Sequence, residues 1–597
     1  MNRIVAEVTK NIVTRSLKTR EHYLKQIESQ LAQRKSRQKL SCGNLAHTVA
    51  TCCDQDKRAI LDFTRLNIGI ITSYNDMVSA HQPYLDYPEH IKHILREHGH
   101  SAQVASAVPA MCDGITQGQA GMELSLFSRD VIAQSTAIGL SHNAFDGALL
   151  LGVCDKIAPG QLIGALQFGH LPTAFIPSGP MTTGIRNKQK VAVRQQYAAG
   201  LVGKDKLQEI ENASYHSQGT CTFYGTANTN QLLLETMGLM LPGAAFVPVN
   251  SPLRQELTRL AVLQMLKIHR NSADFRPLYE VVTEKSLVNA MVALLASGGS
   301  TNHTIHLIAI AKAAGFILTW DDFALLSNEV PLLTRIYPNG DADINDFYQA
   351  GGVPLLLRLL ANRDLLHQDT LPIWGSFEDY LCVPELTQNN EVKFNPILET
   401  KNPDIIAPQH KPFSHKGGIK VVAGNMGRGI IKVSAVEDKY KKIIAPAKVF
   451  ESQDDVVNAY NEGLLAQDAI IVVRNSGPAA RGMPELHKLM PILGNLMESG
   501  FRVALVTDGR LSGASGKVPA VIHLCPESAK CGPLAKITEG DIIKLDAESG
   551  ELTCLADLDS RDMDDPILLQ DEPIAGQRLF ELFRQNVSSA EQGATIF

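Results

Sequence analysis

Residues 147–164, GALLLGVCDKIAPGQLIG, decide how the first half of the chain is interpreted. The apolar run 147–153 is typical of a strand buried on both faces of a parallel sheet, and Pro159 fits the first turn of a following helix. Another apolar run follows at 173–180. Because short apolar strands alternate with helical stretches over residues 60–380, we expect an α/β domain built on a parallel sheet.

Cys154, Asp155 and Lys156 come directly after this predicted strand. In open parallel sheets, ligands bind at the carboxyl ends of the strands, where loops converge. A thiolate favours soft metals and iron–sulfur clusters, whereas a carboxylate favours a hard cation such as Mg²⁺. The three residues therefore suit a point where two metal centres meet. Taken alone, they fit a buried cysteine followed by a surface ion pair better.

Composition limits the classes of protein to consider. The chain has 597 residues, ten cysteines and a formal net charge of -6. This length predicts two or more domains. The negative charge argues against nucleic-acid binding, and no apolar run approaches the roughly 18 residues of a membrane span. The start of the chain lacks the apolar core of a signal peptide, so we expect a cytoplasmic protein whose cysteines bind a metal or cluster.

Three parts are expected along the chain. Residues 1–60 are predicted to be a helical N-terminal arm that packs on the body or on another subunit. Residues 61–395 are the α/β domain, and the loss of periodicity around 385–412 marks its end. Residues 396–597 are expected to form a β-rich, barrel-like domain with a few helices. Its β-like runs are 417–424, 429–436, 468–475, 502–509 and a hairpin in 541–557 that turns at Ser549-Gly550.

Four further segments carry residues suited to metal binding or acid–base chemistry. Asp113 stands in a glycine-rich loop ahead of a long helix, and Cys221 stands in a similar loop ahead of another. Glu485 is expected just inside a helix start, and Ser512 in a glycine-rich turn after a strand. Each segment alone is weak evidence, because glycine-rich turns mostly serve backbone geometry.

Together these segments resemble the dihydroxyacid dehydratase/6-phosphogluconate dehydratase family over nearly the whole chain. CDKIAPGQLIG at 154–164 and ALVTDGRLSGAS at 504–515 match its two signatures, and GGSTNHTIHLIAIAKAAG at 298–315 matches as well. Segments 74–84 and 111–133 are similar to the 6-phosphogluconate branch. We expect the active site between the two domains, and the resemblance implies a homodimer.

The resemblance implies dehydration of a 2,3-dihydroxy acid, here the phosphorylated sugar acid 6-phospho-D-gluconate, to 2-dehydro-3-deoxy-6-phospho-D-gluconate in the Entner–Doudoroff route. The C2 proton is weakly acidic, so a cation must stabilise the charge that develops on the carboxylate and 2-hydroxyl. The 3-hydroxyl needs a Lewis acid, and a base must stand close to the C2 proton. The alternatives are another 2,3-dihydroxy acid, branched-chain or unphosphorylated, and a non-enzymatic iron–sulfur redox sensor.

By the same resemblance, Cys154 and Cys221 would hold an iron–sulfur cluster. Ala80 stands where three-cysteine relatives carry another ligand, so their [2Fe-2S] arrangement does not simply transfer. Cys112 could replace the missing cysteine ligand, but its position beside Asp113 is equally typical of a buried residue next to a metal ligand. The branch implies a [4Fe-4S] cluster with one open iron, with [2Fe-2S] not excluded.

The resemblance also implies a site for Mg²⁺ or Mn²⁺ made by Asp113, Asp155 and Glu485. Lys156 would join these carboxylates only if carbamoylated, because a free ammonium repels a divalent cation.

Ser512 would be the base. A serine hydroxyl holds its proton at neutral pH, so this role requires nearby cations that stabilise the alkoxide, and Arg510 and the metal are candidates. The alternative is a turn hydroxyl that bonds its own backbone.

The sequence says less about the substrate phosphate. Residues 178–180 and 298–302 could present backbone N–H groups to an anion. Arg428 stands where branched-chain relatives tend to carry an acidic residue, so a phosphate contact is expected there. His81 is either a polar contact to the substrate near the same site or a structural histidine.

Overall fold

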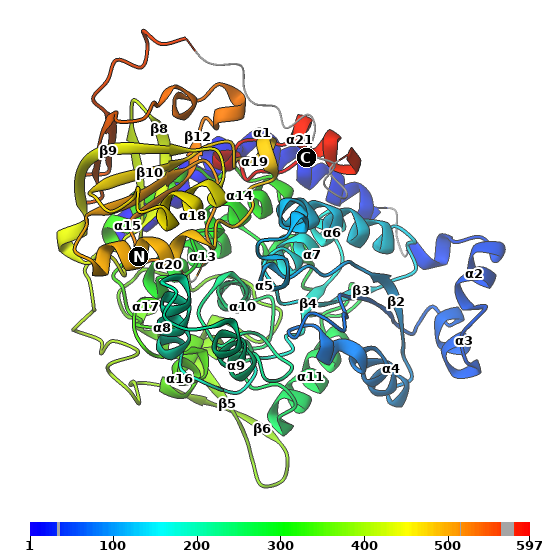
Figure 1. Ribbon diagram of the computed structural model, residues 1–597. Coiled ribbons are helices and arrows are strands. Elements are labelled where there is room, and N and C mark those ends of the chain that lie inside the picture. The colour runs from blue at the N-terminus through cyan, green and yellow to red at the C-terminus, as the bar shows by residue number, and fades with distance from the viewer. Residues whose placement is uncertain (33–35, 514, 563–577) are drawn as a thin grey trace.

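The computed structural model describes residues 1–32, 36–513, 515–562 and 578–597 (Figure 1). Its N-terminal half contains a four-stranded sheet of order β2-β1-β3-β4, in which every neighbouring pair is parallel. The predicted parallel sheet is therefore confirmed. The strands are β1 Asn67–Thr72, β2 Ser101–Ala107, β3 Gly147–Leu151 and β4 Thr173–Phe175. β1 and β3 are buried along their whole length, which explains their continuous apolar sequences.

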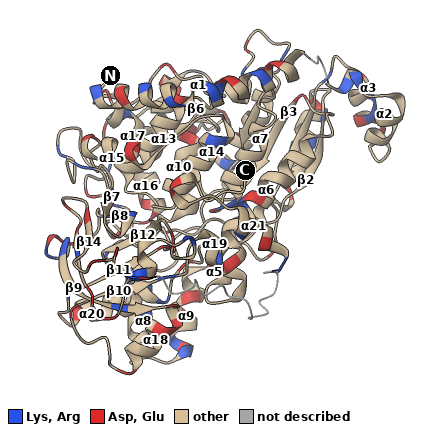
Figure 2. Ribbon diagram, turned by 90° about the horizontal axis from the view of Figure 1, so that it is seen from above, with Lys and Arg blue, Asp and Glu red and all other residues tan. Residues whose placement is uncertain are grey.

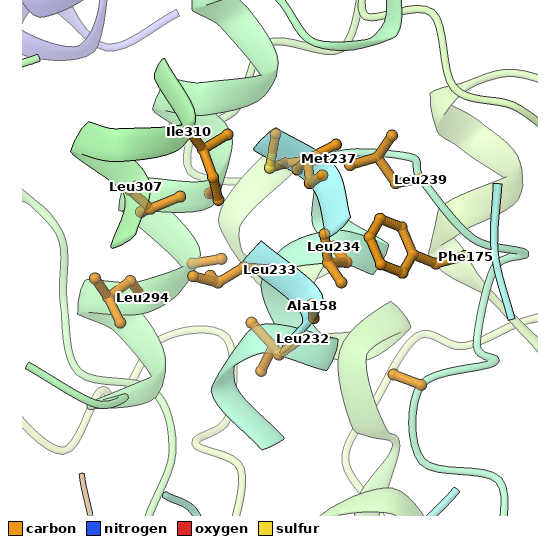
Figure 3. Packing of buried hydrophobic residues seen from close by; sticks show 14 of the residues in the cluster. Ala158, Phe175, Leu232, Leu233, Leu234, Met237, Leu239, Leu294, Leu307 and Ile310 are labelled. Atoms are coloured by element: carbon orange, nitrogen blue, oxygen red, sulfur yellow. The ribbon is translucent and has the colours of Figure 1, made fainter. Parts of the chain in front are cut away.

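Helices surround this sheet and extend its core. In Figure 3, Leu233 of α10 (Thr226–Thr236) points toward Leu294 of α13 (Glu284–Ser297) and Leu307 of α14 (His303–Ala313). The remaining helices of this half are α4 Tyr87–Glu97, α5 Asp113–Thr116, α6 Ser125–Leu140, α7 Ile157–Leu166, α8 Asn187–Ala198, α9 Lys204–Ser214, α11 Pro252–Met265, α12 Leu278–Val281, α15 Trp320–Glu329, α16 Ile344–Ala350 and α17 Gly352–Ala361.

Two glycines let α7 lie directly against α6. A Cβ on Gly160 would stand 2.6 Å from the Arg129 carbonyl oxygen, and one on Gly164 would stand 2.4 Å from that of Ala133. Both distances are shorter than any real contact, so larger residues would force the helices apart. This close packing fixes the start of α7, which directly follows Cys154, Asp155 and Lys156.

The N-terminal arm is helical, with α1 Arg3–Ala32, α2 Cys42–Val49 and α3 Asp54–Leu61. Figure 2 shows α1 running along one edge of the molecule, with the α2–α3 pair projecting beyond it. α1 packs against the body, where it buries Val5, Val8, Ile12, Tyr23 and Ile27. Charges of both signs are interspersed over the elements seen in this view.

The stretch expected to be irregular around 385–412 begins with a regular element instead. β5 (Cys382–Leu386) and β6 (Val392–Pro396) form an antiparallel hairpin. Asn390 in its turn has a φ of 61°, a left-handed conformation that asparagine tolerates better than most residues. The polar composition that predicted a loop thus belongs to an exposed hairpin.

The C-terminal half contains a closed eight-stranded barrel of order β10-β11-β12-β8-β7-β14-β13-β9. The barrel-like prediction is confirmed, including the hairpin of β13 and β14. The strands are β7 Ile419–Gly424, β8 Gly427–Lys432, β9 Lys442–Phe450, β10 Ala469–Val473, β11 Val503–Thr507, β12 Ala520–Cys525, β13 Ile542–Asp546 and β14 Glu551–Cys554. The helices here are α18 Gln453–Asn461, α19 Pro478–Arg481, α20 Leu489–Glu498 and α21 Glu581–Asn586.

The barrel strands beside the helices are buried on both faces. Ile470 and Val472 of β10 point into the barrel core, whereas Ile471 and Val473 pack in the main core of the molecule. This alternation explains why β10 reads as the unbroken apolar run AIIVV. Among the described residues, no helix is long and apolar enough to cross a bilayer.

Candidate functional site

Three buried carboxylates from both halves of the chain meet at one point. One oxygen from each of Asp113, Asp155 and Glu485 lies within 4.8 Å of the other two. Asp113 begins α5 after β2, and Asp155 follows β3, so two carboxyl ends of the parallel sheet supply two of the groups. Glu485 comes from the loop between α19 and α20. Oxygen donors in this arrangement are what a hard divalent cation prefers.

The prediction that Glu485 lies just inside a helix start is wrong. Glu485 forms an isolated parallel β-bridge with Arg510, and α20 begins only at Leu489. Gly482, with a φ of 67°, ends α19 before that bridge. Pairing with the loop after β11 therefore determines the conformation here, and this pairing carries Glu485 to the other carboxylates.

Two buried cations compensate the three carboxylates. The Lys156 amine lies 2.5 Å from Asp113 Oδ2 and 2.6 Å from Asp155 Oδ2, with none of its side chain exposed. Arg510 donates through Nη2 to Asp113 and through Nη1 to Glu485, both at 2.8 Å. The surface ion pair considered for Asp155 and Lys156 is in fact fully enclosed.

The carboxylates differ in their protonation. Burial raises the pKa of Glu485 to about 8, and the negative charge of Asp113 adds to this effect. Burial acts in the same direction on Asp113 and Asp155, but Lys156 and Arg510 together outweigh it and hold both pKa values below the usual range. Without a divalent cation, Glu485 therefore carries a proton at neutral pH, and cation binding would release that proton.

Three thiols lie beside this carboxylate trio. Burial raises the pKa of Cys154, and Cys112 and Cys221 raise it further, which places both thiols within electrostatic range of it. Burial and then Cys221 raise the pKa of Cys112 to about 12. Cys112 precedes α5, Cys154 follows β3 and Cys221 precedes α10, so three separate loops supply them.

This donor set fits an iron–sulfur cluster. Iron–sulfur clusters are held by cysteine thiolates, and a metal deprotonates thiols whose pKa is otherwise high. Among the described residues, the carboxylate trio is the group whose three ligand atoms all lie within 4.8 Å, and the thiols are not in such a group. The three thiols are therefore not all within 4.8 Å of one another.

His81 positions the loop that carries Cys154. Its Nε2 accepts from the backbone N–H groups of Val153 and Cys154 at 3.1 and 3.2 Å. From the other side, the Asn230 amide donates to the Asp155 carbonyl at 3.0 Å. His81 is completely buried and holds the backbone of the Cys154 loop, so it is a structural histidine.

Acid should destabilise the protein through such histidines. Burial lowers the pKa of His81 and of His523 to about 3. The unfolded chain, with an ordinary pKa of about 6.5, binds the extra protons, so stability is lost as the pH falls below that value. We expect about 1.4 kcal/mol lost per pH unit for each histidine, measured from urea denaturation of metal-free protein at pH 7 and pH 5. In His523→Gln the pH dependence should be smaller, and an unchanged dependence would contradict this origin.

The sequence did not identify one group of residues around Asp155. His306 Nε2 lies 3.4 Å from Asp155 Oδ1, and its Nδ1 lies 3.2 Å from the Arg129 guanidinium. Arg129 also donates to the Ala594 carbonyl at 2.6 Å, so the C-terminal segment contacts this network. The available signal was the HTIH sequence at 303–306, which places two histidines about one helical turn apart.

Asp508 connects the loop that carries Arg510 and Ser512 to two neighbouring loops. Its two carboxylate oxygens accept from the backbone N–H groups of Ser476 and Ser528, at 2.8 and 2.9 Å. These residues follow β10 and β12, so one side chain joins the ends of three neighbouring barrel strands. Ser512 lies partly buried in the loop after β11, as predicted.

Replacing Asp508 with alanine would leave both N–H groups buried without an acceptor. We expect a loss of about 2–6 kcal/mol in the free energy of unfolding, because each of the two unsatisfied buried groups costs about 1–3 kcal/mol. Urea denaturation measures this loss, and Asp559→Ala at an exposed position is the control. Equal stabilities of the two variants would show that Asp508 does not hold these loops.

The residues considered for the phosphate are largely engaged elsewhere. Arg428 pairs with Asp321 and with Glu591. In 298–302, four backbone N–H groups donate to protein acceptors. In 178–180, the Ser178 hydroxyl donates to the Ala80 carbonyl. These contacts argue against Arg428 and 298–302 as anion sites, whereas the Ser178 hydroxyl contact does not involve the backbone N–H groups of 178–180.

Comparison with known proteins gives the same relationship along the whole chain. Residues 65–378 match the model of the dihydroxy-acid/6-phosphogluconate dehydratase N-terminal domain, and residues 404–594 match that of the C-terminal domain. The chain is 53% identical to the phosphogluconate dehydratase of Escherichia coli over 600 residues, covering 100% of this chain and 99% of the relative.

Two further relatives show how the similarity is graded. The phosphogluconate dehydratase of Zymomonas mobilis is 51% identical, with 99% of this chain and 97% of the relative covered. The dihydroxy-acid dehydratase of Metallosphaera sedula is 30% identical, with 90% of this chain and 94% of the relative covered.

Proposed function

Since the chain belongs to the dihydroxy-acid/6-phosphogluconate dehydratase family, we propose that it is a hydro-lyase that converts 6-phospho-D-gluconate into 2-dehydro-3-deoxy-6-phospho-D-gluconate, a step of the Entner–Doudoroff route. The higher identity to the phosphogluconate dehydratases than to the dihydroxy-acid dehydratase supports this substrate. The structural observation that carries the proposal is the meeting of Asp113, Asp155 and Glu485 beside the three thiols.

The residues divide into two ligand sets. Cys112, Cys154 and Cys221 would hold a [4Fe-4S] cluster, for which three thiols leave one iron open. Asp113, Asp155 and Glu485 would hold Mg²⁺ or Mn²⁺. When bound, the cluster supplies a Lewis acid for the 3-hydroxyl, and the divalent cation supplies positive charge for the carboxylate and 2-hydroxyl.

Lys156 would change its role when the cation binds. As a free ammonium between Asp113 and Asp155, it supplies the positive charge that the divalent cation would otherwise supply. Carbamoylation joins its neutral amine nitrogen to CO₂ and releases a proton, which turns a cation into a fourth carboxylate. Burial opposes the charged amine, but Asp113 and Asp155 outweigh this and raise the Lys156 pKa, so carbamoylation becomes favourable only when a cation neutralises those carboxylates.

Ser512 would act as the base. As an alkoxide it takes the C2 proton, and the C2–H electron pair forms the double bond to C3. The C3–O bond breaks, the leaving hydroxide takes back the proton from the Ser512 hydroxyl and departs as water, and the resulting enol becomes the 2-keto acid. The family signature at 504–515 supports this assignment, and the Asp508 contacts support a fixed loop at that place.

The proposal also includes the division of the chain into an arm (1–60), an α/β domain (61–395) and a barrel domain (396–597). The site would lie between the last two. A cytoplasmic location and a homodimer also belong to the proposal. All ten cysteines are free, which supports a reducing compartment. Size-exclusion chromatography with light scattering tests the dimer.

The function is tested with protein purified without oxygen and reconstituted with iron, sulfide and Mg²⁺. Three substrates are compared: 6-phosphogluconate, gluconate and a branched-chain dihydroxy acid. We expect kcat/KM for 6-phosphogluconate to exceed the other two by about 100-fold or more, because a site built for polar groups rejects analogues that lack them. Equal values for gluconate, or a preference for the branched-chain acid, would overturn the substrate assignment.

A further inference from the structure

Lys432 is a buried amine next to the turn that carries Ser512. It is the last residue of β8 and is 5% exposed. Its Nζ donates to the Gly513 carbonyl oxygen, at 3.3 Å. Among the described residues, no carboxylate lies within ion-pair distance of this amine. Lysine is rarely buried without a partner, because removing its charge from water is costly.

The turn is confined from two sides. A Cβ on Gly513 would stand 2.4 Å from Ser300 Oγ and 2.9 Å from the Thr226 nitrogen. A Cβ on Gly516 would stand 3.3 Å from Lys432 Cδ. Gly513 is therefore confined by the start of α10 and by Ser300, and Gly516 by the Lys432 side chain.

The other nearby cation is already engaged. Arg510 uses Nε for the Met483 carbonyl, Nη1 for Glu485 and Nη2 for Asp113. All three of its nitrogens thus serve the carboxylate trio and its loop. The expectation that Arg510 stabilises an alkoxide at Ser512 therefore finds no support in its contacts.

We propose that Lys432 is a positioning residue for the dehydration, which holds the Ser512–Gly513 turn and stabilises the deprotonated Ser512 hydroxyl with its positive charge. This inference rests on the proposed function of Ser512. Burial lowers the Lys432 pKa to about 7, so its surroundings lack a compensating negative charge. An alkoxide on the neighbouring residue supplies that charge, and in a buried site such a pair interacts strongly.

The test replaces Lys432 with methionine, which keeps the chain length without the charge, and with arginine, which keeps the charge. Lys420→Met is the matched control, since Lys420 lies on the neighbouring strand β7 with its amine on the Glu548 carbonyl at the surface. In reconstituted holoenzyme, we expect Lys432→Met to lower kcat about 100-fold with KM within about threefold, and Lys432→Arg to recover part of the loss. The iron content should stay at the wild-type value.

Thermal stability distinguishes this role from a purely structural one, because replacing a structural lysine would destabilise the protein. Removing an unpaired buried charge should leave metal-free Lys432→Met at least as stable as wild type in thermal denaturation. An unchanged kcat, a raised KM with normal kcat, or a destabilised variant that Arg fails to rescue would overturn the inference. If the proposed function is wrong, the wild type itself fails to dehydrate the substrate. If only this inference is wrong, the wild type is active and Lys432→Met behaves like Lys420→Met.

Discussion

Replacing Cys154 with serine is expected to remove the bound iron and to abolish turnover. The Cys154 thiol is buried in the loop after β3, with Cys112 and Cys221 close enough to raise its pKa, and a hydroxyl at this place is a poor ligand for a soft metal. Iron and acid-labile sulfide, measured after anaerobic reconstitution, should fall well below the wild-type content. The visible absorption of the cluster should fall in parallel.

Cys554→Ser is the matched control for this experiment. Cys554 is also buried, but it lies on β14 in the barrel core, away from the other thiols. Its variant should keep full iron content and activity. Cys112→Ser then decides the third ligand, because a variant with wild-type iron and turnover would make Cys112 only a buried neighbour of Asp113.

Replacing Glu485 with glutamine is expected to weaken divalent cation binding by about 100-fold or more, because it removes one of three charged ligands. Mn²⁺ binding to the cluster-free protein, followed by the EPR signal of the free ion, measures this directly. In wild type, affinity should rise about tenfold per pH unit up to about pH 8, since the cation displaces the Glu485 proton. The variant should lose this pH dependence.

The control for this loss is Glu235→Gln. Glu235 is completely buried, and it accepts from the backbone N–H groups of Gly243 and Ala245, so it is a carboxylate with a structural role. Its variant should bind Mn²⁺ like wild type. Equal Mn²⁺ affinities of wild type and Glu485→Gln would show that the cation does not bind at the trio.

The parts of the site that could be predicted follow buried strands. The run before Cys154 shows where β3 ends, and DAIIVVRN and RVALVTDG show β10 and β11, because strands buried on both faces are continuously apolar. The carboxyl ends of such strands can be located from local sequence alone. Asp155 and Ser512 were found in this way, whereas Asp113 was found from the glycine-rich loop ahead of a helix, and the family resemblance gave the roles of all three.

The parts that could not be predicted depend on contacts between distant segments. Glu485 takes its conformation from a bridge to Arg510, which no local pattern reveals. β9 contains Pro446, a residue that normally argues against a strand, yet this position lies within a barrel ladder. Asp508 was not singled out from the sequence, although its carboxylate joins the loops after three strands.

The contact of residues 594–596 with α6 has a consequence for the carboxylate trio. Asp130 accepts from Thr595 and Ile596, and Arg129 donates to Ala594 while it contacts His306. Because His306 in turn lies beside Asp155, these contacts connect residues 594–596 to the trio. Removing them should therefore loosen the surroundings of Asp155 and weaken cation binding there, even where the sheet and the barrel stay folded.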